Sequence, residues 1–155
     1  MNGCRAVLVE SDKNYQPDIQ AIEQSISKKT RALVTISPNN PSGRVYEKKT
    51  LEAINRLCAE NRIYHISDEA YEDFVYDQHS HFSPGSLPNA GEHTLSLFSF
   101  SKSYGLAGWR VGYMVVPRQL DLAIRKIHDT LIICPPVIAQ HIAAECLAQL
   151  SLIHI

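Results

Sequence analysis

The chain has 155 residues, of which 45% are hydrophobic and 20% are charged, the composition of an ordinary globular protein. Fifteen basic and sixteen acidic residues give a formal net charge of −1, so charge gives no reason to expect a nucleic-acid partner or an anionic membrane. The four cysteines form no C-x-x-C pair, which argues against a structural zinc site or a dithiol redox motif.

The start of the chain lacks the pattern of a targeting segment. It has no basic patch followed by a long apolar stretch, and no segment stays apolar over the roughly 18 residues that a membrane span needs. We therefore expect a soluble cytoplasmic chain that binds small molecules or another protein, with no membrane and no nucleic acid as partners.

The first half of the chain alternates apolar runs with segments of helical periodicity. The apolar run at 6–10 predicts a strand, and isoleucines at helical spacing over 17–26 predict a helix. A second strand is expected at 31–37, where a compact apolar run meets a segment rich in Pro, Asn and Gly. The next helix is marked by four residues on one face, Leu51, Ile54, Leu57 and Cys58. It should end at Asn61 in a left-handed cap, before a third strand over 62–67.

The second half contains a long loop, two strands and a mostly helical end. Residues 77–91 are polar and rich in Ser, Pro and His, which predicts a loop. Strands are expected at 94–100 and 111–116, and helical periodicity begins at Arg118, interrupted by Pro135-Pro136. Alternating strands and helices imply parallel strands joined by helical crossovers, so the predicted fold class is α/β.

Three polar loops follow predicted strands. Their sequences are SPNNPSG (37–43), SDEAYEDF (67–74) and SFSKSYGLAGWRVGY (99–113). Because ligands in open α/β sheets bind beyond the carboxyl ends of the strands, the side chains of these loops should converge on one site. The candidate residues are Asn40, Asp68, Tyr71 and Lys102.

In this order, the three loop sequences resemble those of the class I and II aminotransferases, which are enzymes of pyridoxal phosphate (PLP) fold type I. The similarity extends from about Cys4 to Leu147. The tract over 126–136 looks similar to aspartate, aromatic or methionine aminotransferases. It implies that residues 1–149 are part of the PLP-binding large domain, with a mostly parallel sheet and helices on both faces. It also implies that the N-terminal part of this domain and a C-terminal small domain are missing, and that the complete protein is a homodimer. The final residues, 150–155, resemble a translated sequencing adapter, so we expect a non-native tail there.

The resemblance implies three catalytic residues. Lys102 would form a Schiff base with the PLP aldehyde and later move a proton at the substrate α-carbon. Asp68 would keep the pyridine nitrogen protonated, so that the ring withdraws electrons. Tyr71, together with Asn40, would hydrogen-bond the phenolic oxygen of the cofactor. The alternatives are a solvated surface lysine at 102, a helix N-cap at Asp68 and a simple turn residue at Asn40.

Three further residues match positions that bind the cofactor phosphate. Arg110 offers a planar fork for bidentate contact, and Ser99 and Ser101 add hydroxyl donors. The alternative for Arg110 is an ion pair with a surface carboxylate. The same resemblance raises the prospect of a cis bond between Asn40 and Pro41.

Two other polar groups are expected to be solvated. His79 and His81 lie in a polar loop with no third ligand at a recognisable spacing, so we expect no metal there. Glu69, Glu72 and Asp73 should form a solvated helix face.

The function implied by the resemblance is that of a PLP-dependent aminotransferase, which moves an amino group between an L-amino acid and a 2-oxo acid. Two alternatives share the fold, a β-lyase and an aminotransferase-like domain of a transcription regulator. Alone, the 155 residues are expected to be inactive and to aggregate, because a parallel sheet must be covered on both faces. The sequence leaves the amino acid substrate open.

Overall fold

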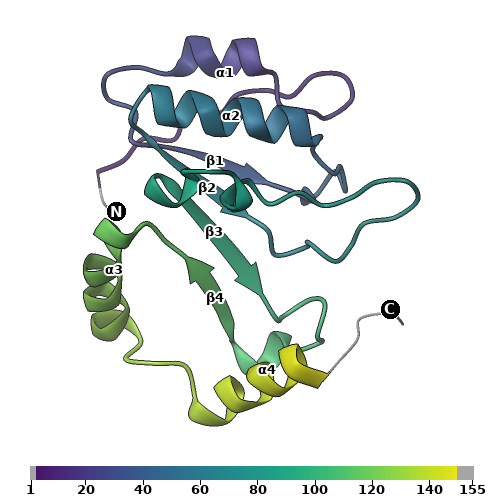
Figure 1. Ribbon diagram of the computed structural model, residues 1–155, viewed down its shortest axis with the longest axis vertical. Helices are drawn as coiled ribbons and strands as arrows, with labels where there is room; N and C mark the ends of the chain where they lie inside the picture. Colours follow the sequence, from purple (N-terminus) through teal and green to yellow (C-terminus); the bar gives the residue numbers. More distant parts are fainter. Residues whose placement is uncertain (1–2, 150–155) are drawn as a thin grey trace.

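A computed structural model describes residues 3–149, which are built on a four-stranded sheet (Figure 1). The strands, in their order across the sheet, are β1 (Ala32–Ile36), β2 (Tyr64–Asp68), β3 (Thr94–Ser99) and β4 (Gly112–Val115). The first three are parallel, and β4 is antiparallel to β3. The α/β class and the mostly parallel sheet are therefore confirmed. The expected non-native tail lies outside the described residues.

Two helices pack together over β1 and β2 (Figure 1). The first is α1 (Ile19–Ser25), where the Asp18 carboxylate accepts hydrogen bonds from the backbone N–H groups of Gln20 and Ala21. The second, α2 (Lys48–Glu60), buries the apolar face that its sequence predicts. The core around the two helices contains Ile22, Ile54, Cys58 and Ile63.

The layer between α2 and the sheet is partly polar. Asn55 of α2 donates from Nδ2 to Nδ1 of His65 (3.1 Å) and to the Thr94 hydroxyl (2.8 Å). Its Oδ1 accepts from Nε2 of His93 at 3.0 Å. Since Nδ1 of His65 is an acceptor here, the hydrogen of this ring lies on Nε2, which donates to the Thr35 hydroxyl at 2.9 Å. The network therefore holds His65 as a neutral ring.

Acid should destabilise this fold through His65. Burial, and to a lesser extent the nearby His93, lower the pKa of His65 from 6.5 to about 4, while Glu69 acts in the opposite direction. In the unfolded chain the pKa of the ring returns to about 6.5, so between about pH 6.5 and 4 the unfolded state binds more protons than the folded state. The contribution of neutral His65 to the free energy of unfolding is therefore complete above about pH 6.5. It is lost as the pH falls toward 4, by up to about 3 kcal/mol.

Urea unfolding at about pH 7.5 and 4.5 measures this effect. The free energy of unfolding should fall more steeply with acid in the wild type than in His65→Gln, whose side chain does not titrate. An equal pH dependence in the two proteins would contradict the assignment to His65.

Two further α-helices follow β4, and three short 3-10 helices lie in the loops. They are the helices α3 (Arg118–Leu131) and α4 (Val137–Gln149) and the short 3-10 helices η1 (Pro84–Ser86), η2 (Ala90–Glu92) and η3 (Ala107–Trp109). Pro135 and Pro136 separate α3 from α4, as predicted. The small side chains of α4 pack on the loop after β3, in a cluster of Phe100, Val111, Ala139 and Ala143. Across residues 3–149, no helix is both long enough and apolar enough to cross a membrane.

The two faces of the sheet are covered unequally in the described part of the chain. On the face toward α2, Thr35, His65 and Ser96 of β1 to β3 are buried, whereas on the other face Val34 is 61% exposed and Met114 is 50% exposed. Ile66 and Leu95 lie between them on the same face and are half-buried. Helices α1 and α2 supply the expected helical layer on one face, and α3 and α4 lie on the β4 side (Figure 1).

The strand predicted at 6–10 is wrong. These residues form no strand, and Leu8 is 93% exposed. The nearest pairing is an isolated bridge between Ser11 and Pro17. The propensity of a β-branched run is weak and depends on context, and within residues 3–149 no neighbouring strand pairs with this run.

The left-handed cap predicted at Asn61 is also wrong. Asn61 is the C-cap of α2 with φ −88°, and the following residue, Arg62, takes the left-handed conformation with φ 54°. The position after the C-cap is where left-handed residues usually lie, and the prediction was one residue too early. Because Arg62 belongs to this turn, β2 begins at Tyr64 rather than at 62.

Candidate active site

Three loops leave the sheet side by side at the carboxyl ends of the parallel strands. β1 ends at Ile36, β2 at Asp68 and β3 at Ser99. In the strand register Asp68 is paired with Ile36 on one side and with Leu97 on the other. The loops that follow these ends therefore start from one edge, as the sequence predicts.

Asn40, Tyr71 and Lys102, one from each loop, meet at this edge. The Asn40 amide donates from Nδ2 to the Tyr71 hydroxyl oxygen at 3.3 Å. The Lys102 ammonium nitrogen lies 5.6 Å from the centroid of the Tyr71 ring, within the range of a cation–π contact. Lys102 and Asn40 are exposed, so a ligand can reach both. The bond between Asn40 and Pro41 is cis, as the resemblance suggests.

Asp68 is the last residue of β2 and is half-buried. Its Oδ1 accepts a hydrogen bond from the Ala70 backbone N–H at 3.1 Å. A turn rather than a helix follows, so Asp68 closes an Asx-type turn and is not a helix N-cap. Within residues 3–149, Oδ2 accepts no hydrogen bond, which leaves one carboxylate oxygen for a ligand.

The loop that carries Lys102 is fixed at its base. The backbone N–H of Leu106 donates to the Phe100 carbonyl at 3.2 Å, and that of Gly105 donates to the Lys102 carbonyl at 3.1 Å. Gly105 has φ +65°, a left-handed conformation that glycine adopts without steric cost. The turn therefore presents Lys102 from a tightly closed loop.

Arg110 lies at the end of the same loop and is also left-handed, with φ 53° and ψ 49°. This conformation is uncommon for a residue other than glycine, and such strain tends to occur at functional positions. The guanidinium is exposed and donates to the Ala107 carbonyl at 2.7 Å. In the described part of the chain it forms no ion pair, so the alternative of a surface pair with a carboxylate is not observed.

Comparison with known proteins decides the family. The family model of aminotransferase class I and II matches residues 1–153. The chain belongs to this family. The expected family and fold are therefore confirmed for this aminotransferase-family chain.

Curated and solved aminotransferases resemble the chain over about nine tenths of its length. The aspartate/prephenate aminotransferase of Thermus thermophilus is 39% identical over 138 residues, 89% of this chain and 35% of that protein. Kynurenine–oxoglutarate transaminase 1 of Mus musculus is 37% identical, over 88% of this chain and 32% of that protein. The solved T. thermophilus aspartate aminotransferase with maleate matches with a TM-score of 0.86 at 39% identity, covering 91% of this chain and 37% of that one. The chain thus spans about a third of the length of these curated relatives.

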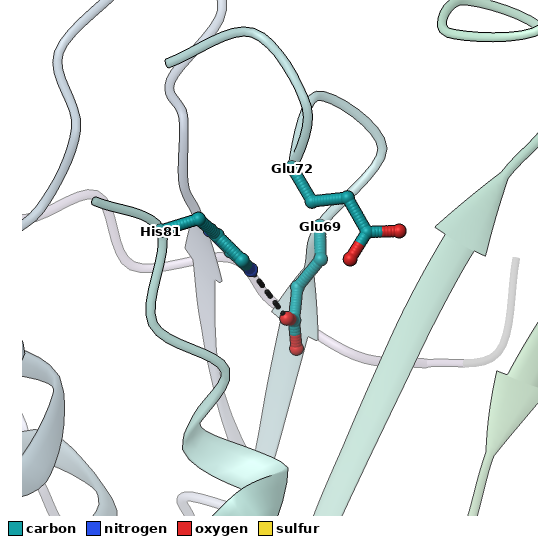
Figure 2. A group of neighbouring side chains, drawn as sticks. All are labelled: Glu69, Glu72 and His81. Atoms are coloured by element: carbon teal, nitrogen blue, oxygen red, sulfur yellow. Dashed lines mark hydrogen bonds and ion pairs between the residues drawn. The ribbon is translucent and has the colours of Figure 1, made fainter. Parts of the chain in front are cut away.

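A buried carboxylate lies next to Asp68 in this aminotransferase-family chain, contrary to the predicted solvated helix face. Glu69 is 1% exposed, and a turn at 70–73 takes the place of a helix. Its Oε2 lies 2.8 Å from Nε2 of His81 (Figure 2). Its Oε1 accepts a hydrogen bond from the Ser83 hydroxyl at 3.0 Å. The prediction that His81 is a solvated loop residue is therefore wrong as well.

One sequence signal could have found Glu69. His65 and Ser67 alternate on the buried face of β2, and Glu69 is the next residue of that period-two pattern. His81 has no such signal, because only the three-dimensional path of the loop brings it back to Glu69. His79, in the same loop, is exposed as predicted.

Glu72 lies near this pair without joining it. One ligand atom from each of Glu69, Glu72 and His81 lies within 4.8 Å of the other two. Burial raises the pKa of Glu72, Asp73 and Glu69 raise it further, and His81 acts in the opposite direction. Both oxygens of Glu69 already accept hydrogen bonds, so we interpret the group as a hydrogen-bonded network rather than a metal site.

Proposed function

We propose that the protein is a PLP-dependent aminotransferase, which moves an amino group between an L-amino acid and a 2-oxo acid. The observation that carries the proposal is the meeting of Asn40, Tyr71 and Lys102 at the carboxyl edge of the sheet, in a chain of the aminotransferase family. The relatives described above are named as aminotransferases or transaminases, which favours amino-group transfer over a β-lyase or a regulator.

The side chains at this edge suit the chemical groups of PLP. For the aldehyde there is the exposed amine of Lys102, and for the phenolic oxygen there are the Tyr71 hydroxyl and the Asn40 amide. For the ring nitrogen there is the Asp68 oxygen that accepts no hydrogen bond in residues 3–149. For the phosphate there is Arg110, which is free of ion pairs in that range. Each group of the cofactor therefore has a partner of matching charge and hydrogen-bonding capacity.

The roles of the residues follow from these partners. When bound, PLP supplies an aldehyde that condenses with amines and a ring that withdraws electrons from the substrate α-carbon. Lys102 Nζ would hold the aldehyde between turnovers and would take up the proton that leaves the α-carbon. Asp68 holds a proton on the ring nitrogen. Because Asn40 donates to the Tyr71 oxygen, the hydroxyl hydrogen of Tyr71 stays available for the phenolic oxygen.

The residues proposed to bind the phosphate, Ser99, Ser101 and Arg110, lie at the base of the Lys102 loop. The Val111 carbonyl accepts from the Phe100 N–H at 3.4 Å, which places the adjacent Arg110 beside the start of the loop. Ser99 Oγ accepts from the Ser101 N–H at 3.1 Å, so its own hydrogen is free to point at a phosphate oxygen. Arg110 supplies the cation, and the hydroxyls of Ser99 and Ser101 supply neutral donors.

The proposal includes the setting of the reaction. We propose that the intact protein works in the cytoplasm, in amino acid metabolism, as a homodimer.

An amino-transfer assay tests the proposal. The intact protein with added PLP is given a panel of amino acids, including aspartate and the aromatic amino acids, with 2-oxoglutarate as acceptor. We expect glutamate to form faster than with free PLP at the same concentration. Release of ammonia, pyruvate and the departing thiol from cystathionine, without glutamate, would instead identify a β-lyase. Cofactor binding without any of these products would identify a sensor domain.

A further inference from the structure

We propose that Glu69 is a positioning residue of the cofactor site, which holds Tyr71 in place by fastening the loop over 81–83 to the end of β2. The inference rests on the proposed function, because Tyr71 matters to the chemistry only if PLP binds beside it. Glu69 itself touches neither the cofactor groups nor Lys102 in this assignment.

The Glu69 carboxylate is buried and fully hydrogen-bonded. Its side chain is 0% exposed, and its two oxygens accept from two different residues, His81 Nε2 at 2.8 Å and the Ser83 hydroxyl at 3.0 Å. A buried carboxylate is retained only where donors compensate for the lost water. Figure 2 shows the His81 ring meeting Glu69, with Glu72 not joined to either.

The backbone of Glu69 is fixed as firmly as its side chain. Its N–H donates to the Leu97 carbonyl of β3 at 2.9 Å, and its carbonyl accepts from the Glu72 N–H at 2.9 Å. Glu69 therefore ties together the sheet, the turn that carries Tyr71, and the loop that returns at 81–83.

Tyr71 depends on this turn for its position. It lies two residues after Glu69, its carbonyl accepts from the Phe74 N–H at 2.9 Å, and its ring packs edge-on against Phe74 at 6.0 Å. Without the Glu69 contacts, His81 and Ser83 no longer tie the segment that follows Phe74 to the end of β2. The turn then keeps its backbone hydrogen bonds but loses the side-chain contacts, so the Tyr71 hydroxyl is held less firmly relative to Asn40 and Lys102.

The test is a pH titration of the absorbance of PLP bound to the intact protein, together with its dissociation constant. In Glu69→Ala we expect the midpoint to rise by about one pH unit, because a hydrogen bond from Tyr71 to the phenolic oxygen is weakened. The dissociation constant should rise by about tenfold. His81→Ala and Ser83→Ala should each change both quantities in the same direction and by less.

The sign of the shift separates positioning from charge. Removing a nearby negative charge alone would lower the midpoint. The protonated form of the nitrogen that links Lys102 to PLP is positively charged, and it would lose a favourable interaction with that charge. Glu72→Ala is the matched control: it removes a carboxylate from the same turn but neither of the two contacts, so its midpoint should not rise. A midpoint in Glu69→Ala that stays the same or falls would overturn the inference.

Two further outcomes are informative. If Glu69→Ala does not fold, as judged by circular dichroism, His81→Ala and Ser83→Ala decide, and wild-type midpoints and affinities in both would overturn the inference. If the wild-type protein itself does not bind PLP through Lys102, the proposed function fails rather than this inference alone.

Discussion

Replacing Lys102 with alanine should lower kcat/KM for amino-group transfer by about 10³-fold or more. The reason is that one amine both holds the cofactor and moves the proton at the α-carbon, and acid–base catalysis by one positioned group is worth about 10²–10⁴-fold on its own. The measurement is steady-state kinetics of the intact protein with its best amino donor and 2-oxoglutarate.

Lys49→Ala is the matched control for this experiment. The Lys49 side chain is 82% exposed and is paired with Glu47 on the surface of α2, so its loss should leave the rate within about twofold of the wild type. A Lys102→Ala protein with activity within about tenfold of the wild type would refute the catalytic role of Lys102.

Asp68 and Arg110 should fail in different ways when each is replaced by alanine. Asp68→Ala should leave PLP bound but reduce turnover severely, because the phosphate contacts remain while the ring nitrogen loses the carboxylate that keeps it protonated. Arg110→Ala should chiefly weaken PLP binding, by roughly 1.5–3 kcal/mol for the loss of charged hydrogen bonds, or about 10- to 150-fold in the dissociation constant. Equilibrium binding of PLP and kcat at saturating PLP separate the two effects.

Arg56→Ala serves as the control for the loss of a cation. Arg56 is 73% exposed on α2, in a long surface pair with Glu60, and its replacement should leave PLP affinity unchanged. If Asp68→Ala and Arg110→Ala showed the same combination of lost affinity and lost turnover, the division of roles between ring and phosphate would be wrong.

The elements with a strong local pattern are those that the sequence predicts well. α2 has a complete apolar face, and β1 is a compact apolar run that ends in a breaker-rich loop, so neither depends on distant contacts for its identity. The direction of β4, in contrast, cannot be read from a local pattern, because it depends on the connection from β3. That connection contains only the three-residue η3, too short for the crossover that a parallel strand needs, and β4 therefore returns antiparallel.

In the site, too, some residues are predictable from local sequence and others depend on distant contacts. Asn40, Tyr71 and Lys102 are predictable because each follows the end of a parallel strand, and the sheet alone brings those ends together. Glu69 is wrongly predicted as solvated because three acidic residues in a short segment suggest a helix surface, although the period-two pattern of β2 points to its burial. Its hydrogen-bond partners lie 12 and 14 residues later. Such a pairing is decided by the path of the loop, which no local pattern encodes.

The central claim is that Lys102 is the residue that binds PLP covalently, and borohydride reduction tests it most directly. Reduction makes the link between the cofactor and its lysine permanent, so that digestion and mass spectrometry can locate it. The intact, PLP-saturated protein should yield the cofactor on the peptide that contains Lys102, and Lys102→Ala should yield none above the level of surface lysines. Stoichiometric cofactor on any other lysine, with Lys102 unmodified, would contradict the claim.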